Sequence, residues 1–166
     1  ISACLVGSEM CIRDSPDLGL VFAGPTGWGS DQLQAAVDRS PFRSRIVRTG
    51  WLEPAALGAV LRSATALVFP SLYEGFGFPP LQAMAAGVPV VATRTGAVPE
   101  VVGRAAELVV PKDPDALGDA IARVVDSTER RAELVAEGHR HVAGFTWQRC
   151  AAGLSELYHD VANERR

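Results

Sequence analysis

A single carboxylate stands in a long uncharged stretch of the sequence. From Ser63 to Thr93, Glu74 is the only charged residue among thirty-one, and it lies in the segment SLYEGFGFPP. Gly75 and Gly77 let the backbone come close to a ligand, because glycine has no side chain and tolerates unusual backbone angles. Such a loop would place the Glu74 carboxylate beside a bound ligand.

The elements around Glu74 place this carboxylate at the edge of a sheet. Residues 66–70 (ALVFP) are typical of a buried strand, and residues 79–86 of a short helix that stops at Gly87. Open α/β folds bind ligands at the carboxyl ends of their strands. We expect the loop of residues 71–78, which we call the Glu74 loop, at that edge. The start of the following helix favours an anionic group such as a diphosphate. The alternative is that Glu74 only caps the following turn.

Short apolar runs alternate with helical patterns between residues 18 and 126, which predicts a parallel sheet covered by helices on both faces. This is a doubly wound, Rossmann-like α/β layout. The predicted strands are residues 18–24, 45–50, 66–70, 88–93 and 107–110. The predicted helices begin at Ser30 as an N-cap, at Glu53, at Pro79, at Asp113 with Pro114, at Thr128 (ending near Glu137) and at Thr146.

Helical periodicity indicates which side chains turn inward. The helix after Ser30 carries Leu33 and Val37 on one face, and the next helix carries Leu57 among its inward residues. In the last helix an apolar stripe runs from Trp147 to Val161, which we interpret as a core face.

Composition and spacing exclude several classes of protein. The net charge of −3 and the absence of a basic block argue against a nucleic-acid partner. Cys4, Cys11 and Cys150 are irregularly spaced, which predicts neither a disulfide framework nor a zinc site. His139 and His141 lie two apart and face different sides of a helix, so we do not expect them to share a metal ion.

The first fifteen residues, ISACLVGSEMCIRDS, do not follow this pattern. They hold two of the three cysteines and have no clean periodicity. We interpret residues 1–15 as a non-native leader joined to a domain that spans residues 16–166, with the first strand–helix unit missing or replaced. The alternative is an ordinary first strand, ACLVG.

The segment from Glu74 to Ala92 (EGFGFPPLQAMAAGVPVVA) resembles the signature of family-4 retaining glycosyltransferases of GT-B fold. Three further segments resemble other motifs of that family in the same order: Gly50–Leu52 (GWL), Gly96–Val102 (GAVPEVV) and Phe145–Trp147 (FTW). The resemblance covers about residues 17–160, and several linked motifs in the right order make it specific.

The resemblance implies one half of a GT-B enzyme, the C-terminal domain that binds a nucleotide-sugar donor. Glu74 would contact the hydroxyls of the donor sugar and support positive charge at the anomeric carbon. The loop at Trp51 and Leu52 would read the nucleotide base, and Gln82 would hold the ribose. The full donor-binding set that the resemblance implies is Trp51, Leu52, Gly75, Phe76, Gly77, Leu81 and Gln82.

The chain departs from the family pattern at two places. Gln82 stands where the family has a second Glu, and the lost charge assistance would cost about 1–2 kcal/mol of donor affinity. The alternative is that Gln82 is an ordinary surface residue. The family also places an Arg and a Lys after the first strand of this domain to neutralise the diphosphate, whereas the single lysine here, Lys112, follows the fifth predicted strand.

The resemblance implies that the parent protein is a hexosyltransferase that uses a UDP- or GDP-sugar and a glycan or lipid-linked acceptor. Its acceptor domain is the missing N-terminal half, so we expect the fragment alone to be inactive, since one domain cannot exclude water or orient an acceptor. The resemblance implies no metal and no cofactor. We expect a cytoplasmic protein, with peripheral contact to the inner membrane surface through the absent half.

Two other interpretations compete with a transferase. A non-catalytic nucleotide-sugar-binding module or pseudoenzyme half is favoured by Gln82 and by the missing Arg and Lys. A flavodoxin-like receiver domain needs an acidic cluster at its strand ends, and the residues found there are Gly24, Gly50, Pro70 and Thr93.

Overall fold

Five short strands alternate with helices along the described part of the chain, as the sequence predicts. The computed structural model describes residues 17–25, 27 and 29–164, so the predicted leader lies outside the described residues. The strands are β1 (Leu20–Ala23), β2 (Ile46–Gly50), β3 (Leu67–Phe69), β4 (Val90–Thr93) and β5 (Ala106–Val109). The helices are α2 (Ser30–Arg39), the 3-10 turn η1 (Arg43–Arg45), α3 (Pro54–Ser63), α4 (Phe78–Ala85), α5 (Val98–Val102), α6 (Pro114–Asp126), α7 (Thr128–Val142) and α8 (Trp147–Glu164).

All strand pairs are parallel, but the described strands form two separate sheets. One sheet consists of β1 and β2, and the other has the order β3-β4-β5. In the second sheet Val90 of β4 lies opposite both Leu67 and Ala106. Parallel strands joined by helical connections confirm the predicted α/β fold.

Strand β4 forms the centre of the core, because all four of its residues are buried. Val90 and Ala92 belong to one apolar cluster with Met84 of α4. Val91 belongs to a second cluster with Ile121 of α6. Since successive side chains of a strand point to opposite faces, helices cover both faces of β4, as predicted.

The starts of α6 and α2 are set by different chemistry. Asp113 caps α6 by accepting a 2.9 Å hydrogen bond from the N–H of Ala116, in agreement with the sequence prediction. The prediction that Ser30 is the N-cap of α2 is wrong. Gly29 holds the N-cap with a φ of 78°, and Ser30 is the first helical residue. Glycine enters this left-handed conformation at little cost, so the backbone and not a hydroxyl sets the turn before α2.

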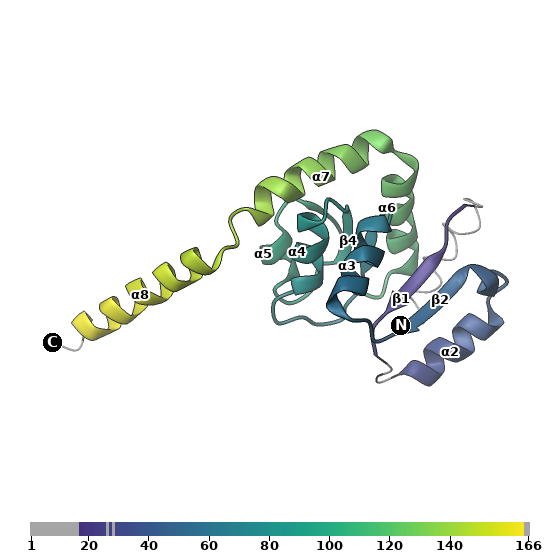
Figure 1. The fold of residues 1–166 in the computed structure, drawn as a ribbon, viewed down its shortest axis with the longest axis horizontal. Coiled ribbons are helices and arrows are strands. Elements are labelled where there is room, and N and C mark those ends of the chain that lie inside the picture. The colour runs from purple at the N-terminus through teal and green to yellow at the C-terminus, as the bar shows by residue number, and fades with distance from the viewer. Residues whose placement is uncertain (1–16, 26, 28, 165–166) are drawn as a thin grey trace.

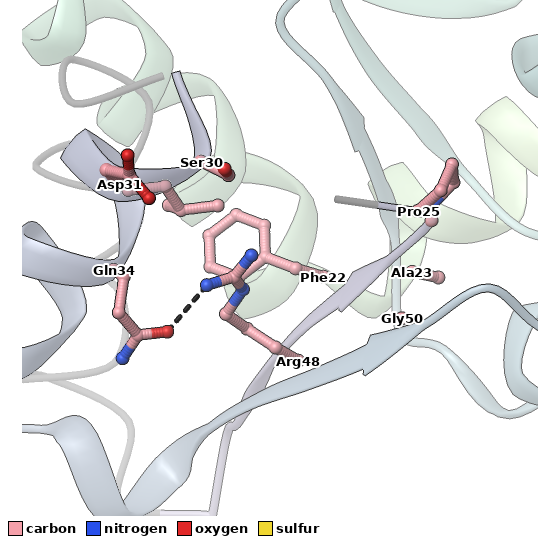
Figure 2. Close-up of a pocket in the computed structure, with 10 residues that line it drawn as sticks. Phe22, Ala23, Pro25, Ser30, Asp31, Gln34, Arg48 and Gly50 are labelled. Atoms are coloured by element: carbon pink, nitrogen blue, oxygen red, sulfur yellow. Dashed lines mark hydrogen bonds between the residues drawn. The ribbon is translucent and has the colours of Figure 1, made fainter. Parts of the chain in front are cut away.

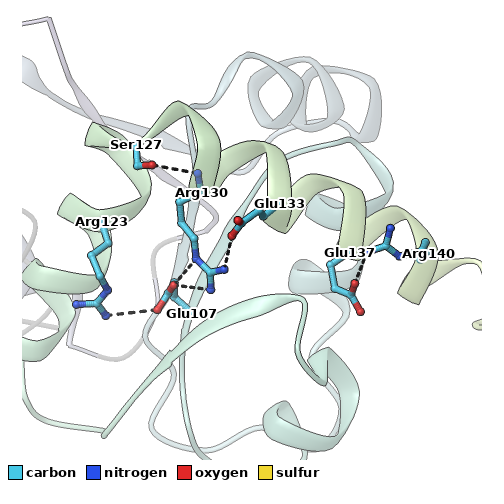
Figure 3. A network of polar contacts seen from close by, with 7 residues as sticks. All are labelled: Glu107, Arg123, Ser127, Arg130, Glu133, Glu137 and Arg140. Atoms are coloured by element: carbon cyan, nitrogen blue, oxygen red, sulfur yellow. Dashed lines mark hydrogen bonds and ion pairs between the residues drawn. The ribbon is translucent and has the colours of Figure 1, made fainter.

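An ion-pair network joins α6 and α7 to β5 (Figure 3). Glu107 of β5 accepts a 2.8 Å hydrogen bond from Arg130 and lies 3.4 Å from Arg123. Arg130 also contacts Glu133 at 2.9 Å. The hydrogen bond to Glu133, followed by the one to Glu107, raises the pKa of Arg130 above its ordinary value. The arginines are partly exposed, so the network orients the helices and adds little stability.

Helix α7 supports the helix that follows the Glu74 loop. It continues beyond the predicted end near Glu137 to Val142. Gly138 of α7 faces Met84 of α4 so closely that a Cβ added there would lie 3.1 Å from the Met84 Cγ. The absence of a side chain at residue 138 therefore allows α4 and α7 to pack tightly.

Helix α8 extends away from the rest of the molecule (Figure 1). Trp147 is 82% exposed, and Leu154, Tyr158 and Val161 are exposed as well. The interpretation of this stripe as a core face is therefore wrong for the part of the chain that the structure describes, because no element there covers it. Leu57 of α3 was also predicted to face inward and is exposed.

Among the described residues, no helix combines the length and apolarity needed to span a membrane.

The difference between α7 and α8 gives a test of where the core lies. Leu134→Ala removes a side chain that is 2% exposed, and we expect the free energy of unfolding to fall by about 2–5 kcal/mol because a cavity forms. Leu157→Ala makes the same chemical change at a side chain that is 55% exposed, where we expect about 0.5 kcal/mol or less. Urea unfolding of both variants measures the difference, and equal losses would contradict the described position of α8.

Candidate functional site

The Glu74 loop connects the carboxyl end of β3 to α4, as predicted. Glu74 is partly buried, and its Oε1 lies 3.2 Å from the hydroxyl of Ser71, which also lies 3.0 Å from the carbonyl oxygen of Tyr73. The Ser71 hydroxyl therefore helps to orient the carboxylate within its own loop. The side chain is not turned away into solvent.

The end of β4 and the loop that follows it hold the Glu74 loop through hydrogen bonds. Thr93 donates a hydrogen bond from its hydroxyl to the carbonyl of Ser71, and Thr95 donates one to the carbonyl of Leu72 at 2.8 Å. The N–H of Ala97 donates to the carbonyl of Glu74 at 3.1 Å. Three successive contacts thus tie the loop after β3 to the loop after β4, and the two loops form one unit.

Gly96 is the point of closest approach between these two loops. Its φ is 50°, and a Cβ added there would lie 2.3 Å from the carbonyl oxygen of Glu74. Such a distance is shorter than any real contact, so only glycine fits at residue 96. The sequence alone gave no reason to single out Ser71, Thr95 or Gly96 as determinants of the Glu74 position.

Backbone amides beside Glu74 are available to an anionic ligand. Among the residues described, no hydrogen bond uses the N–H of Gly75, Phe76 or Gly77 as a donor. Gly77 is the N-cap of α4 with a φ of 104°. Successive free amides at such a turn form a concave donor group of the kind that binds phosphates or sugar hydroxyls.

The N-terminus of α4 contributes less to this group than the sequence suggested. The helix begins at Phe78, so Pro79 and Pro80 occupy its first turn. Proline has no N–H, and the two residues remove donors that the first turn of a helix normally offers. Any anion beside Glu74 would therefore depend on the amides before the helix.

The remaining predicted residues of α4 face in different directions. Leu81 is 6% exposed and lies in the apolar core with Met84, so its side chain supports the helix. Gln82 lies on the exposed side of α4.

The ring of Phe76 packs on Phe78 with 4.8 Å between centroids and lies 6.3 Å from Phe145, which precedes α8. Sequence reasoning did not connect Phe145 with the Glu74 loop.

Trp51 and Leu52 follow the carboxyl end of β2, in the other sheet. Trp51 is exposed and Leu52 is partly buried. In the part of the chain that the structure describes, no hydrogen bond or ring contact joins either residue to the Glu74 loop. The predicted residues from Glu74 to Gln82 therefore lie on one loop and helix, and within the described residues no such contact links Trp51 or Leu52 to them.

A pocket of about 490 Å³ lies between α2 and the carboxyl ends of β1 and β2 (Figure 2). Phe22 and Arg48 line it from the strands, and Asp31 and Gln34 line it from α2. The guanidinium of Arg48 donates a 2.5 Å hydrogen bond to the side-chain oxygen of Gln34. Glu74 does not line this pocket.

Within the described ranges no group of three or more His, Cys, Asp or Glu side chains could hold a metal ion.

Two glycines offer a matched test of the contact between the loops. Gly96→Ala forces a side chain into the Glu74 carbonyl at a positive φ, and we expect a loss of at least about 1–3 kcal/mol in unfolding free energy. Gly75→Ala has no atom within 4 Å of the new Cβ, and we expect a change of about 0.5 kcal/mol or less. Hydrogen exchange of the Ala97 amide should accelerate in the first variant only. Unchanged exchange in Gly96→Ala would refute the described contact.

Comparison with known proteins gives a consistent result. The sequence pattern of the family described as Glycosyl transferases group 1 matches residues 8–127. The O-antigen chain mannosyltransferase B of Escherichia coli is 34% identical over 84% of this chain and 36% of its own length. The MMP alpha-(1->4)-mannosyltransferase of Mycolicibacterium hassiacum is 44% identical over 69% of this chain and 29% of its own length. The chain thus spans about a third of the length of these relatives.

Solved structures share the fold. Sucrose-phosphate synthase from Thermosynechococcus elongatus superimposes with a TM-score of 0.81 at 24% identity, over 98% of this chain and 43% of that protein. The separately crystallised C-terminal domain of a group 1 glycosyltransferase, LpcC, from Francisella tularensis matches with a TM-score of 0.76 at 23% identity, over 86% of this chain and 76% of that domain. Anabaena HepE, in complex with UDP and glucose, matches with a TM-score of 0.78 at 20% identity, over 91% of this chain and 44% of that protein. The fold is that of the C-terminal domain of GT-B glycosyltransferases, and the chain belongs to the group 1 glycosyltransferase family.

Proposed function

We propose that this chain is the donor-binding half of a retaining glycosyltransferase, and that its parent transfers a hexose from a UDP- or GDP-sugar to a glycan or lipid-linked acceptor. One observation carries the proposal: an oriented carboxylate, Glu74, stands beside the three amides of Gly75, Phe76 and Gly77, which have no partner among the described residues. A nucleotide sugar needs both groups, because it joins a hydroxyl-rich ring to a diphosphate.

The two groups would act on different parts of the donor. As the diphosphate leaves, negative charge grows on its oxygens and positive charge grows on the anomeric carbon. The amides would stabilise the first charge, and Glu74 would stabilise the second. Both groups are fixed in the fold before any ligand binds, so they require little reorganisation in the transition state.

The names of relatives support the choice of substrate class. The relatives include mannosyltransferases and D-inositol 3-phosphate glycosyltransferases, among them one from Corynebacterium glutamicum that is 40% identical over 87% of this chain. The structural neighbour HepE was crystallised with UDP and glucose. These proteins favour a hexose donated from a nucleotide sugar. We further propose that the reaction requires no metal and no other cofactor. Cytoplasmic location and contact with the inner membrane surface, through the half that this chain lacks, are also proposals.

Gln82 keeps a second candidate open, a module that binds nucleotide sugars without catalysis. Its position on the exposed side of α4 is compatible with contact to a ribose, but an amide cannot give the charge assistance of a carboxylate. Both candidate functions require binding of a nucleotide sugar, and only the transferase also requires turnover by the parent protein. Titration calorimetry with UDP and GDP tests the binding that both require.

Replacing Glu74 tests its role in the reaction. In the full-length parent, Glu74→Gln removes the negative charge at similar volume, and we expect kcat to fall by about 100- to 1,000-fold. The affinity for UDP should change little, because UDP carries no sugar for Glu74 to contact. Glu129→Gln, at an exposed glutamate of α7, serves as the control and should leave kcat unchanged. Normal turnover in Glu74→Gln would exclude the proposed mechanism.

Restoring a carboxylate at residue 82 tests the contact with the ribose. We expect Gln82→Glu to tighten UDP binding by about 1–2 kcal/mol, which corresponds to roughly 5- to 30-fold. Gln148→Glu, on exposed α8, is the control for added negative charge. The gain should shrink with 2′-deoxy-UDP, which lacks one of the two ribose hydroxyls. A gain of equal size for both nucleotides would argue against this contact.

A further inference from the structure

The three amides beside Glu74 lie in a segment that has little to restrain it from within. Phe76 carries the one side chain of the segment Gly75–Gly77, since both of its neighbours are glycines. A backbone flanked by two glycines has many accessible conformations, and fixing one of them costs conformational entropy. The rest of the fold therefore has to hold this segment through its ends or through the ring of Phe76.

Helix α5 and the loop before it restrain the two ends of the segment. The N–H of Ala97 donates to the carbonyl of Glu74 at 3.1 Å. At the other end, a Cβ added at Gly77 would lie 3.8 Å from a methyl group of Val98, which is fully buried. Between these two points, the ring of Phe76 is the side chain through which the segment can be held.

The ring of Phe145 meets the ring of Phe76 from a distant part of the chain. The two centroids lie 6.3 Å apart, with an angle of 76° between the ring planes. Aromatic pairs prefer an edge-to-face arrangement at this separation. Phe76 is 38% exposed and Phe145 is 42% exposed, so the pair lies at the surface, where a contact adds less to stability than one in the core.

Phe145 is itself held by the turn between α7 and α8. Its N–H donates a 2.9 Å hydrogen bond to the carbonyl of Val142, the last residue of α7. Its ring centroid lies 5.3 Å from that of His141. The next residue, Thr146, accepts a 3.2 Å hydrogen bond from the N–H of Arg149 in the first turn of α8. The ring of Phe145 therefore extends from a turn that is fixed on both sides.

His141 in turn is attached to α5. Its Nε2 lies 2.7 Å from the carbonyl oxygen of Val101, and because a carbonyl oxygen only accepts, Nε2 carries the hydrogen that is donated. Gly103, in the turn after α5, leaves room for this ring, since a Cβ added there would lie 3.0 Å from the His141 Cε1. Helix α5 thus restrains the ends of the amide segment directly and its middle through His141 and Phe145.

We propose that Phe145 is a positioning residue of the donor site. Its ring, held by His141, fixes Phe76 between the two restrained ends, so that the amides of Gly75, Phe76 and Gly77 keep one arrangement in which to meet a diphosphate. Amides that are already ordered bind an anion more tightly, because binding does not have to order them. The identity of the ligand rests on the proposed function, whereas the ordering of the amides requires no ligand.

Nuclear magnetic resonance relaxation of the backbone amides in the 166-residue chain tests the ordering. In the unaltered chain we expect order parameters of about 0.85 at Phe76 and Gly77. Phe145→Leu removes the ring and should lower both to below about 0.6, whereas Phe145→Tyr keeps the ring and should retain the order. Phe42→Leu makes the same change at a partly buried phenylalanine beside α2 and should alter neither amide. Equal order parameters in the unaltered chain and in Phe145→Leu overturn the proposal.

A double-mutant cycle tests whether the effect passes through the ring of Phe76. In a chain that already carries Phe76→Leu, the further change Phe145→Leu should lower the order parameter of Gly77 no further, because the partner ring is gone. A further loss as large as in the unaltered background refutes the contact. If Phe145→Leu fails to fold, His141→Leu is the second variant. It removes the ring that holds Phe145 and should lower the same two order parameters.

Titration calorimetry with UDP connects the ordering to the ligand. We expect Phe145→Leu to bind UDP about five- to tenfold more weakly than the unaltered chain, and Phe145→Tyr to stay within about twofold of it. If the unaltered chain binds UDP and Phe145→Leu binds it equally well, the role in donor binding is refuted. If the unaltered chain binds neither UDP nor GDP, the proposed function fails, and the order parameters still decide whether Phe145 positions the amides.

Discussion

The contact between the Glu74 carbonyl and the loop at Gly96 is the constraint on which the candidate site depends. Besides its internal contacts, the Glu74 loop accepts hydrogen bonds donated by Thr93, Thr95 and Ala97 at the end of the neighbouring strand and in the loop after it. Because β4 is fully buried, the core fixes these donors. The donors in turn fix the backbone of the Glu74 loop and so the position of its carboxylate.

The same arrangement explains how an exposed loop can hold backbone amides in fixed positions. Amides normally lose their binding capacity when they pair within a turn or a helix. Here Pro79 and Pro80 lie in the first turn of α4 and have no N–H groups, and the amides of Gly75 to Gly77 donate no hydrogen bond to any described residue. Phe76 packs on Phe78, and the aromatic contact supports the backbone between them. Carboxylate and amides are thus held by different parts of the fold.

The two sheets differ in how completely they are covered. The β3-β4-β5 sheet has helices on both faces, and α7 supports α4 through the close contact of Gly138 with Met84. The β1-β2 sheet packs on α2, with Leu33, Val37 and Ile46 forming its small core.

The sequence by itself determined the element types, the parallel α/β fold and the position of Glu74 at the end of a strand. These features are local, because periodicity, Gly, Pro and capping residues such as Asp113 act within a few residues of chain. Only the tertiary structure decided that Gly29 and not Ser30 caps α2, and that the stripe of α8 is exposed within this chain. It also revealed the support of Glu74 by Thr95 and Gly96, since contacts across some twenty residues leave no periodic signal. Burial depends on which neighbours are present, and a sequence pattern shows that a face is apolar without showing what covers it.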